Sequence, residues 1–304
     1  MTPPLDIAPE VAAALDEGRA VVALESTIVS HGLPRPRNLA LARAAEAEIR
    51  ETGATPATIA VLNGRLRIGL SDAELVRLAE AEGVAKLSRA DLAACMAAGG
   101  TGATTVAATM IAAARAGIAV FATGGIGGVH RGWETSLDIS ADLQELAQSP
   151  VTVVAAGAKA ILDLPATLEV LESLGVPVIA VGQDEFPAFW SRRSGLFAPL
   201  RMDDPAEIAR AHRLRAGLGL PGGQLVANPV PAEAEIPADE IAPLIARAAE
   251  EVAARGVTGK AVTPALLSRL LELTQGRSLA ANVALVLNNA RLAARIAQEL
   301  AAGA

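Results

Sequence analysis

The sequence predicts an α/β protein of three layers, in which a mostly parallel central sheet is covered by helices on both faces. Short apolar runs such as Val151–Ala155 alternate with alanine-rich helical stretches along the chain. Continuous β-branched runs are typical of strands that are buried on both faces. No shift of composition marks a linker and no internal repeat is evident, so we expect a single domain over residues 1–304.

The composition excludes several classes of function. Hydrophobic residues make up 52% of the chain and aromatic residues only 2%, which argues against stacking on single-stranded nucleic acid. With 26 basic and 33 acidic residues, the net charge of −7 provides no broad basic surface for nucleic acid or an anionic membrane. Cys95 is the only cysteine, so no intramolecular disulfide forms. We see no signal peptide and no membrane span, and expect a soluble, cytoplasmic protein.

The first elements are expected to be a helix over Asp6–Glu17 and a strand over Ala20–Leu24. Two prolines and a glycine in Ser30–Asn38 indicate a loop. Asn38 is expected to cap a helix that runs to about Glu51. These elements place Glu25 directly after the first buried strand.

A hairpin and two short helices are predicted next. Asn63-Gly64 is typical of the turn between strands Thr58–Leu62 and Arg65–Ile68. Ser71 and Glu74 have the spacing of a capping box for a helix that ends near Ala81. A strand over Val84–Lys86 and a helix near Asp91–Ala97 follow.

Later elements continue the alternation. Gly99–Ala114 is expected to be a glycine-rich turn that opens a helix, and Ile118–Ala122 a strand. The remaining predicted elements are helix Pro165–Leu174, strands Pro177–Val181 and Leu225–Ala227, and a mostly helical region from Ala238 with breaks at Gly256–Pro264 and Gly276. The long irregular segment Gln183–Pro205 holds Phe186, Phe189, Trp190 and Phe197, and we expect it to be a lid that orders on ligand binding.

Lys159 is the first candidate for chemistry. It follows strand Val151–Ala155 and Gly157, where ligands bind in open α/β sheets. Its neighbours Ala158, Ala160 and Ile161 are apolar, and poor solvation disfavours the ammonium form of a lysine. A neutral amine attacks a carbonyl and forms a Schiff base. The alternative is a lysine whose amine reaches the surface from a helix start.

Two further charged residues follow strands. Glu25 emerges from an apolar strand, where a carboxyl group serves as a general acid, or else it pairs with Arg35 or Arg37. Lys86 lies at another strand end, as an anion ligand or as a surface residue. The three histidines, among them His31, lack the spacing of zinc ligands.

The LDISAD motif is a candidate for cation or anion binding. Asp138, with several waters, is suited to Mg²⁺ or Mn²⁺ when the substrate brings a phosphate. Alternatively, Ser140 caps a helix with Asp142 near its positive end. Two glycine-rich turns, before Val106 and at Gly124–Gly128, offer backbone N–H groups to phosphate or serve only tight packing.

Together these segments resemble the pseudouridine-5′-phosphate glycosidase family, which includes the indigoidine-synthase-A-like proteins. The resemblance covers nearly the whole chain. The matching segments, in the family's order, are ALESTIVSHGLPRPRN (Ala23–Asn38), IAVLNGRLRIGL (Ile59–Leu70), KLSRADL (Lys86–Leu92), GGTGATTVAATM (Gly99–Met110), FATGGIGGVHRGWETSLDISADL (Phe121–Leu143), AGAKAILDLPATLEVLESLGVPV (Ala156–Val178), DEFPAFWSRRSG (Asp184–Gly195), TGKAVTPALL (Thr258–Leu267) and TQGRSLAANVALVLNNA (Thr274–Ala290).

The resemblance implies a lyase-type glycosidase that reversibly cleaves the carbon–carbon glycosidic bond of pseudouridine 5′-phosphate to uracil and ribose 5-phosphate. It implies Lys159 as the Schiff-base nucleophile, Glu25 as the proton donor and Asp138 as the ligand of Mn²⁺ or another divalent cation. It implies a homotrimer. The implied substrate contacts are Lys86, Val106, Ser140, Ala141, Asp142, His130 and Asn282.

Three alternatives stay open. One is a Schiff-base lyase or aldolase that acts on another sugar phosphate. Another is an indigoidine-pathway homologue with a different substrate. The third is a nucleotide-binding module built on Gly124–Gly128, which lacks the acidic residue expected on the ribose.

Overall fold

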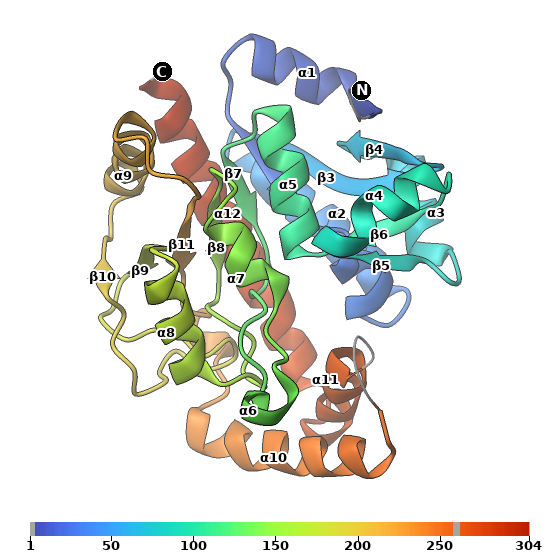
Figure 1. Cartoon of the computed structure of the whole chain (residues 1–304), viewed down its shortest axis with the longest axis vertical. Helices are drawn as coiled ribbons and strands as arrows, with labels where there is room; N and C mark the ends of the chain where they lie inside the picture. The colour runs from blue at the N-terminus through green and yellow to red at the C-terminus, as the bar shows by residue number, and fades with distance from the viewer. Residues whose placement is uncertain (1–3, 258–261, 304) are drawn as a thin grey trace.

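The computed structural model describes residues 4–257 and 262–303 (Figure 1). Within these residues an eleven-stranded sheet has the order β1-β4-β3-β2-β7-β8-β11-β9-β10, and β5 and β6 join it beside β3. The strands are β1 (Leu5–Ile7), β2 (Val21–Leu24), β3 (Thr55–Leu62), β4 (Arg65–Ile68), β5 (Ala85–Leu87), β6 (Gly102–Thr104), β7 (Val120–Ala122), β8 (Thr152–Ala155), β9 (Val178–Ala180), β10 (Leu200–Arg201) and β11 (Gln224–Ala227).

The helices connect these strands and cover the sheet. They are α1 (Pro9–Asp16), the π-helix η1 (Ile28–Gly32), α2 (Arg37–Glu51), α3 (Asp72–Glu80), α4 (Arg89–Ala97), α5 (Val106–Ala116), α6 (Trp133–Ser136), α7 (Ala141–Leu146), α8 (Leu164–Ser173), α9 (Pro205–Gly217), the 3₁₀ helix η2 (Ala232–Ala234), α10 (Ala238–Ala254), α11 (Val262–Leu273) and α12 (Arg277–Ala302).

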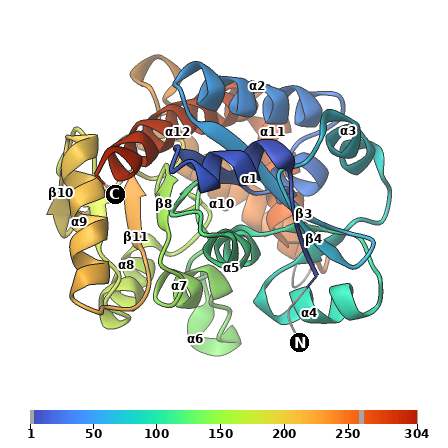
Figure 2. The ribbon, with the colours of Figure 1, turned by 90° about the horizontal axis from the view of Figure 1, so that it is seen from above.

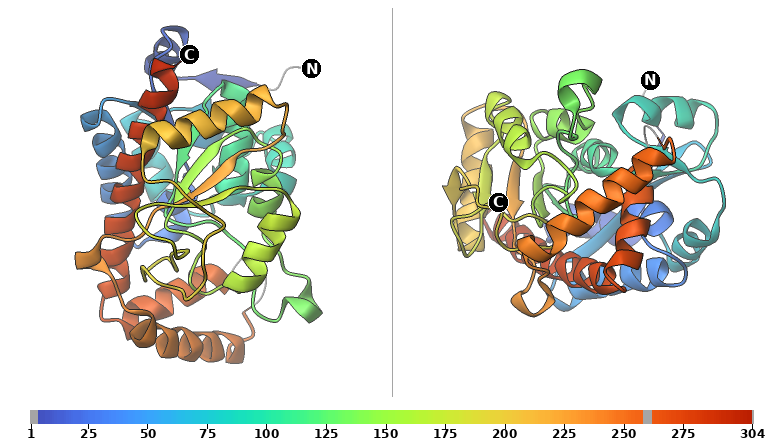
Figure 3. Two further views of the ribbon diagram at one scale, coloured as in Figure 1. Left: turned by 90° about the vertical axis from the view of Figure 1, so that its left-hand side faces the viewer. Right: turned by 90° about the horizontal axis from the view of Figure 1, so that it is seen from below.

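The three-layer prediction is confirmed. Viewed from above, α2 and α12 lie on one face of the sheet and α5, α7 and α8 on the other (Figure 2). The central strands β2, β7, β8, β11 and β9 pair in parallel, whereas β3 pairs antiparallel with β4 and β6. Helices α10 and α11 lie below the sheet, beyond the carboxyl ends of its strands (Figure 3).

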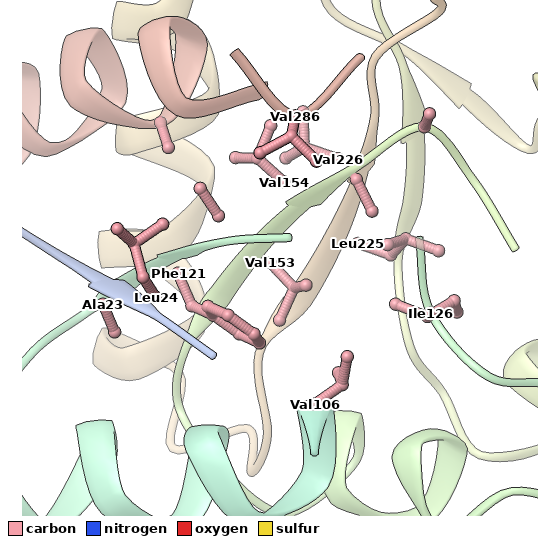
Figure 4. Packing of buried hydrophobic residues seen from close by; sticks show 14 of the residues in the cluster. Ala23, Leu24, Val106, Phe121, Ile126, Val153, Val154, Leu225, Val226 and Val286 are labelled. Atoms are coloured by element: carbon pink, nitrogen blue, oxygen red, sulfur yellow. The ribbon is translucent and has the colours of Figure 1, made fainter. Parts of the chain in front are cut away.

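The core forms on both faces of the central strands because successive side chains of a strand point to opposite sides. Phe121 and Val153 lie on the side of Val106 of α5, and Val154 lies on the side of Val286 of α12 (Figure 4). These side chains are at most 5% exposed. Complete burial of such a side chain is worth roughly 1.5–3 kcal/mol, so the core holds the strand ends in a fixed arrangement.

Most predicted elements are present, but several boundaries were wrong. Leu5–Ile7 is a strand that pairs with β4 and not the start of a helix. Asn38 does not cap α2, because Pro36 occupies the cap position; the buried Asn38 amide donates to the carbonyl oxygens of Val29 and Ala79. The η1 helix and strand β6 were not predicted. The expected break at Gly256–Pro264 lies partly outside the described residues.

The segment after β9 differs from the expected lid. Phe186, Phe189 and Trp190 are at most 6% exposed and belong to the core, whereas Phe197 is 76% exposed. Phe189 and Trp190 pack edge to face in a T-shaped contact, with ring centroids 5.0 Å apart. Aromatic burial therefore explains the composition of this segment, which packs against the loop that carries Lys159.

Candidate active site

A cleft of about 400 Å³ lies where the carboxyl ends of β2, β7 and β8 meet. Every residue proposed from the sequence for catalysis, substrate binding or metal binding lines it. These residues are Glu25, Lys86, Val106, His130, Asp138, Ser140, Ala141, Asp142, Lys159 and Asn282. Segments far apart in the sequence thus converge on one volume, as expected for the carboxyl edge of a parallel sheet.

Lys159 is held by a loop that continues the pairing of β8 beyond the strand itself. The backbone N–H of Ile126 donates to the Gly157 carbonyl at 3.1 Å, and the N–H of Lys159 donates to the Ile126 carbonyl at 3.1 Å. The Lys159 loop is therefore joined to the glycine-rich loop after β7. This pairing positions the lysine at the cleft while its side chain stays half-buried.

Gly157 is required by this arrangement. Its φ is +79°, and a Cβ atom there would lie 2.2 Å from the carbonyl oxygen of Pro187. We expect Gly157→Ala to lose more than the roughly 1–2 kcal/mol that left-handed backbone alone costs, as measured by urea unfolding. Gly18→Ala is the matched control, because Gly18 has φ +66° and open space around it. Equal losses in the two variants would contradict the steric argument.

Glu25 is fixed by two hydroxyl groups. Thr27 Oγ1 donates to one carboxylate oxygen and Thr123 Oγ1 to the other. No ion pair joins Glu25 to Arg35 or Arg37 in the described structure, so that alternative was wrong; Arg35 donates instead to the Ala81 carbonyl at 2.9 Å. The two threonine hydroxyl groups therefore hold the carboxyl group at the cleft wall.

Three helix N-termini open on the cleft beside Lys86. Strands β5 and β6 pair in parallel with Leu87 opposite Thr104, so the next residues, Ser88 and Thr105, begin α4 and α5 side by side. Ser140 caps α7 and accepts from the N–H of Asp142 at 3.2 Å. The first N–H groups of a helix lack partners within the helix and favour anions. This part of the cleft is suited to a phosphate.

Asp142 joins two of these elements. Its Oδ1 accepts from the N–H of Ala107 in the first turn of α5 at 2.9 Å, and its Oδ2 accepts from the N–H of Gly127 at 2.8 Å. The residue is 6% exposed. Both carboxylate oxygens thus bind protein backbone, and the carboxylate holds the first turn of α5 and the loop after β7 together.

We expect Asp142→Asn to destabilise the fold by about 1–3 kcal/mol, because a buried N–H then loses its acceptor. The free energy of unfolding in urea measures the loss. Asp138→Asn is the matched control: Asp138 is exposed on the same segment, and its substitution should change stability by no more than about 0.5 kcal/mol. Equal losses of unfolding free energy in the two variants would contradict the structural role of Asp142.

Asp138 and His130 lie together at the rim of the cleft. The His130 N–H donates to the Asp138 carbonyl at 3.0 Å, and His130 Nδ1 is 3.9 Å from Asp138 Oδ2. The described residues contain no group of three or more His, Cys, Asp or Glu side chains that would enclose a metal ion. A single half-exposed carboxylate fits a cation that keeps most of its waters and binds together with a phosphate.

Other cleft residues were not proposed from the sequence. His31 lines the cleft, its Nδ1 lies 2.7 Å from Ser30 Oγ, and burial, with the nearby charge of Lys86, lowers the pKa of its imidazole. Asn282, which was proposed as a substrate contact, accepts at Oδ1 from Trp190 Nε1 at 2.7 Å, which fixes its amide. Thr27 and Thr123, which bind Glu25, were not proposed either. The only indications in the sequence were that Thr27 lies two residues after Glu25 and that Thr123 directly follows a strand.

Known proteins resemble the chain over nearly its whole length. Residues 10–299 match the family described as indigoidine synthase A like protein. A pseudouridine-5′-phosphate glycosidase of a Jannaschia species is 69% identical over 300 residues, which are 99% of each chain. The protein of that name from Deinococcus radiodurans is 59% identical over 297 residues, covering 98% of this chain and 95% of its own.

Two solved structures share the fold. The prealnumycin C-glycosynthase AlnA, in complex with ribulose 5-phosphate, has a TM-score of 0.91 and 39% identity, covering 98% of this chain and 97% of its own. An indigoidine synthase A-like protein from Thermotoga maritima has a TM-score of 0.89 and 39% identity, covering 98% and 96%. These matches agree with the architecture described above.

Proposed function

Because the chain belongs to the indigoidine synthase A-like family, we propose that it cleaves the carbon–carbon glycosidic bond of pseudouridine 5′-phosphate, giving uracil and ribose 5-phosphate, and also runs in reverse. The observation that carries the proposal is the convergence of Lys159, Glu25 and the three helix N-termini on one cleft. A nucleophilic amine, a carboxyl group and an anion site are the parts that this reaction needs.

Lys159 and Glu25 divide the chemistry in the proposed mechanism. A C-glycoside has no leaving oxygen to protonate, so two carboxylates do not suffice. The Lys159 amine bonds to the anomeric carbon as the bond to the ring oxygen breaks, and the amine loses its proton. The product of this step is a secondary amine. Its nitrogen lone pair forms the iminium as the carbon–carbon bond breaks, the bonding electrons and a proton go to the uracil carbon, and water then releases ribose 5-phosphate from Lys159. Glu25 supplies the proton to the ring oxygen or to the uracil carbon.

The phosphate group of the substrate is bound by the protein at a distance from the reacting carbon. We assign it to Lys86, the N–H of Val106 and the Ser140–Asp142 turn, where the helix N-termini meet. His130 and Asn282 are additional substrate contacts in this proposal. Binding energy at the phosphate holds the anomeric carbon near Lys159, which replaces a bimolecular encounter by a positioned one.

A divalent cation, Mn²⁺ or another, is proposed at Asp138, where it would neutralise phosphate charge. We expect chelation by EDTA to remove activity and added Mn²⁺ to restore it. Binding of Mn²⁺ to the protein, followed by electron paramagnetic resonance in the presence of ribose 5-phosphate, should weaken in Asp138→Asn. Full activity after chelation, with unchanged Mn²⁺ binding in the variant, would remove the metal from the proposal.

The test of the reaction itself is borohydride trapping with ribose 5-phosphate, followed by peptide mass mapping, together with an assay of uracil release. A reduced pentose-phosphate adduct on Lys159 and uracil release are the expected results. A second candidate, a lyase or C-glycosynthase acting on another sugar phosphate, is favoured by the similarity to the C-glycosynthase. An adduct without uracil release would support this second candidate.

The assembly and location are also proposals. No helix among the described residues combines the length and the apolarity that crossing a bilayer requires. We propose a cytoplasmic homotrimer, and the exposed Leu214, Leu218 and Leu220 near α9 are suited to burial between copies. Light scattering tests this with an expected mass of about three times 30.8 kDa.

A further inference from the structure

A pair of buried asparagines lies beneath the floor of the cleft. Asn289 of α12 is 0% exposed, and Asn228, which follows β11, is 8% exposed. Burial of an amide is unfavourable unless its polar atoms are hydrogen-bonded. Neither residue was proposed from the sequence as a substrate contact, so their hydrogen bonds require another explanation.

The hydrogen bonds of Asn289 lead to the strand end that holds Glu25. Asn289 Nδ2 donates to the Thr123 carbonyl at 2.8 Å and, at 3.4 Å, to the Gly124 carbonyl. Asn289 Oδ1 accepts from Asn228 Nδ2 at 3.0 Å. Thr123 in turn donates its hydroxyl proton to Glu25. Hydrogen bonds therefore link Asn228 to the Glu25 carboxyl group through Asn289 and through Thr123, whose backbone carbonyl accepts and whose side-chain hydroxyl donates.

The same series reaches the loop that carries Lys159. The backbone N–H of Asn228 donates to the Ala155 carbonyl at 2.8 Å, and the N–H of Ala156 donates to the Gly124 carbonyl at 2.9 Å. The ends of β7, β8 and β11 are thus joined to α12 at one point. Asn282 lies seven residues before Asn289, two turns along α12 and on a similar face, so this helix contributes both to the cleft and to its support.

We propose that Asn289, held by Asn228, is a positioning residue that sets the orientation of the Glu25 carboxyl group through Thr123. The expected loss of turnover rests on the proposed function, whereas the expected displacement of the Glu25 carboxyl group does not. A carboxyl group that must deliver a proton has to lie within hydrogen-bond distance of its target atom, and small displacements cost rate. Asn289 acts only through other residues.

The test compares Asn289→Leu and Thr123→Val with a neighbouring control. Either change should lower kcat for uracil release roughly 10- to 100-fold, with KM changed less than about threefold, because positioning and not binding is lost. Thr123→Ser keeps the hydroxyl group and should restore most of the rate. Asn288→Ala is the control: Asn288 donates to the Pro229 carbonyl at 3.1 Å, away from Glu25.

The double variant decides whether the two residues act in series. Asn289→Leu combined with Thr123→Val should be no slower than the slower single variant, since both remove the same effect. If Asn289→Leu does not fold, Asn228→Ala replaces it in the test, because this change removes only the hydrogen bond from Asn228 Nδ2 to Asn289 Oδ1. The proposal is overturned if the losses of kcat in the two single variants multiply in the double variant. It is also overturned if KM changes without kcat, or if the loss of kcat only equals that of Asn288→Ala.

Crystal structures of the variants separate this inference from the proposed function. The Glu25 carboxyl group should move by about 0.5 Å or more in Asn289→Leu and Thr123→Val, and stay in place in Asn288→Ala. An unmoved carboxyl group overturns the positioning role. If the wild-type protein released no uracil but the displacement occurred, the proposed function would fail and the positioning role would stand.

Discussion

Lys159→Ala is expected to abolish turnover while the fold remains intact. Removal of a nucleophile from a site whose other groups stay in place lowers kcat by roughly 10⁴-fold or more. The backbone N–H of Lys159 keeps its bond to the Ile126 carbonyl, so the loop retains its pairing. Uracil release from pseudouridine 5′-phosphate and thermal unfolding, measured in parallel, check both parts of this expectation.

Two further lysine variants test whether Lys159 acts as a nucleophile or only as a positive charge, and whether Lys86 binds the phosphate. Lys159→Arg keeps a positive charge, but its guanidinium stays protonated and does not form an imine, so it should be as inactive as Lys159→Ala. Lys86→Ala should mainly raise KM, because Lys86 is assigned to the phosphate. Near-normal uracil release by Lys159→Ala, or a trapped adduct that persists in it, would refute the Schiff-base role.

Glu25→Gln is expected to lower kcat by about 10²- to 10⁴-fold, the usual contribution of a positioned general acid. Glutamine preserves the size of the side chain and the acceptor oxygen for one threonine, so the cleft should keep its shape. Stopped-flow or steady-state assays of uracil release measure the effect. KM should change little, because the carboxyl group acts on the reacting atoms and not on the phosphate.

Borohydride trapping with ribose 5-phosphate distinguishes Glu25→Gln from the Lys159 variants. Open-chain ribose 5-phosphate already presents an aldehyde, so Glu25→Gln should still form a borohydride-reducible adduct on Lys159, whereas Lys159→Ala should not. Glu25→Asp retains a carboxyl group at a shorter reach and should fall between the wild type and Glu25→Gln. An unaffected rate in Glu25→Gln would move the proton donor to another residue.

The strand ends were the predictable part of the site. Lys159 and Glu25 follow apolar β-branched runs, and the carboxyl ends of parallel strands meet at one edge of a sheet. The cleft confirms that these segments converge. The specific roles came from the resemblance of long segments to a family and not from spacing, and the nucleophile, proton-transfer, substrate-binding and metal roles all stay predictions.

Local signals failed where longer contacts decide the structure. Asn38 has the residue type of a cap, yet its amide binds the carbonyl oxygens of η1 and α3. The aromatic residues after β9 suggested a lid, yet Phe186 and Trp190 are buried in the core. In both cases the preference of one short segment was outweighed by packing against segments that are distant in sequence.

The sequence by itself determined the alternation of strands and helices, the residues that follow each strand, and family membership. These features depend on periodicity and on residue type within short windows. Only the tertiary structure decided which hydrogen bonds fix the proposed catalytic groups. Asn289 and Thr123 lie 166 residues apart, and no local pattern relates them. Their contact exists because α12 packs across the sheet, where a buried amide must find its partners among the backbone groups that the fold places within reach.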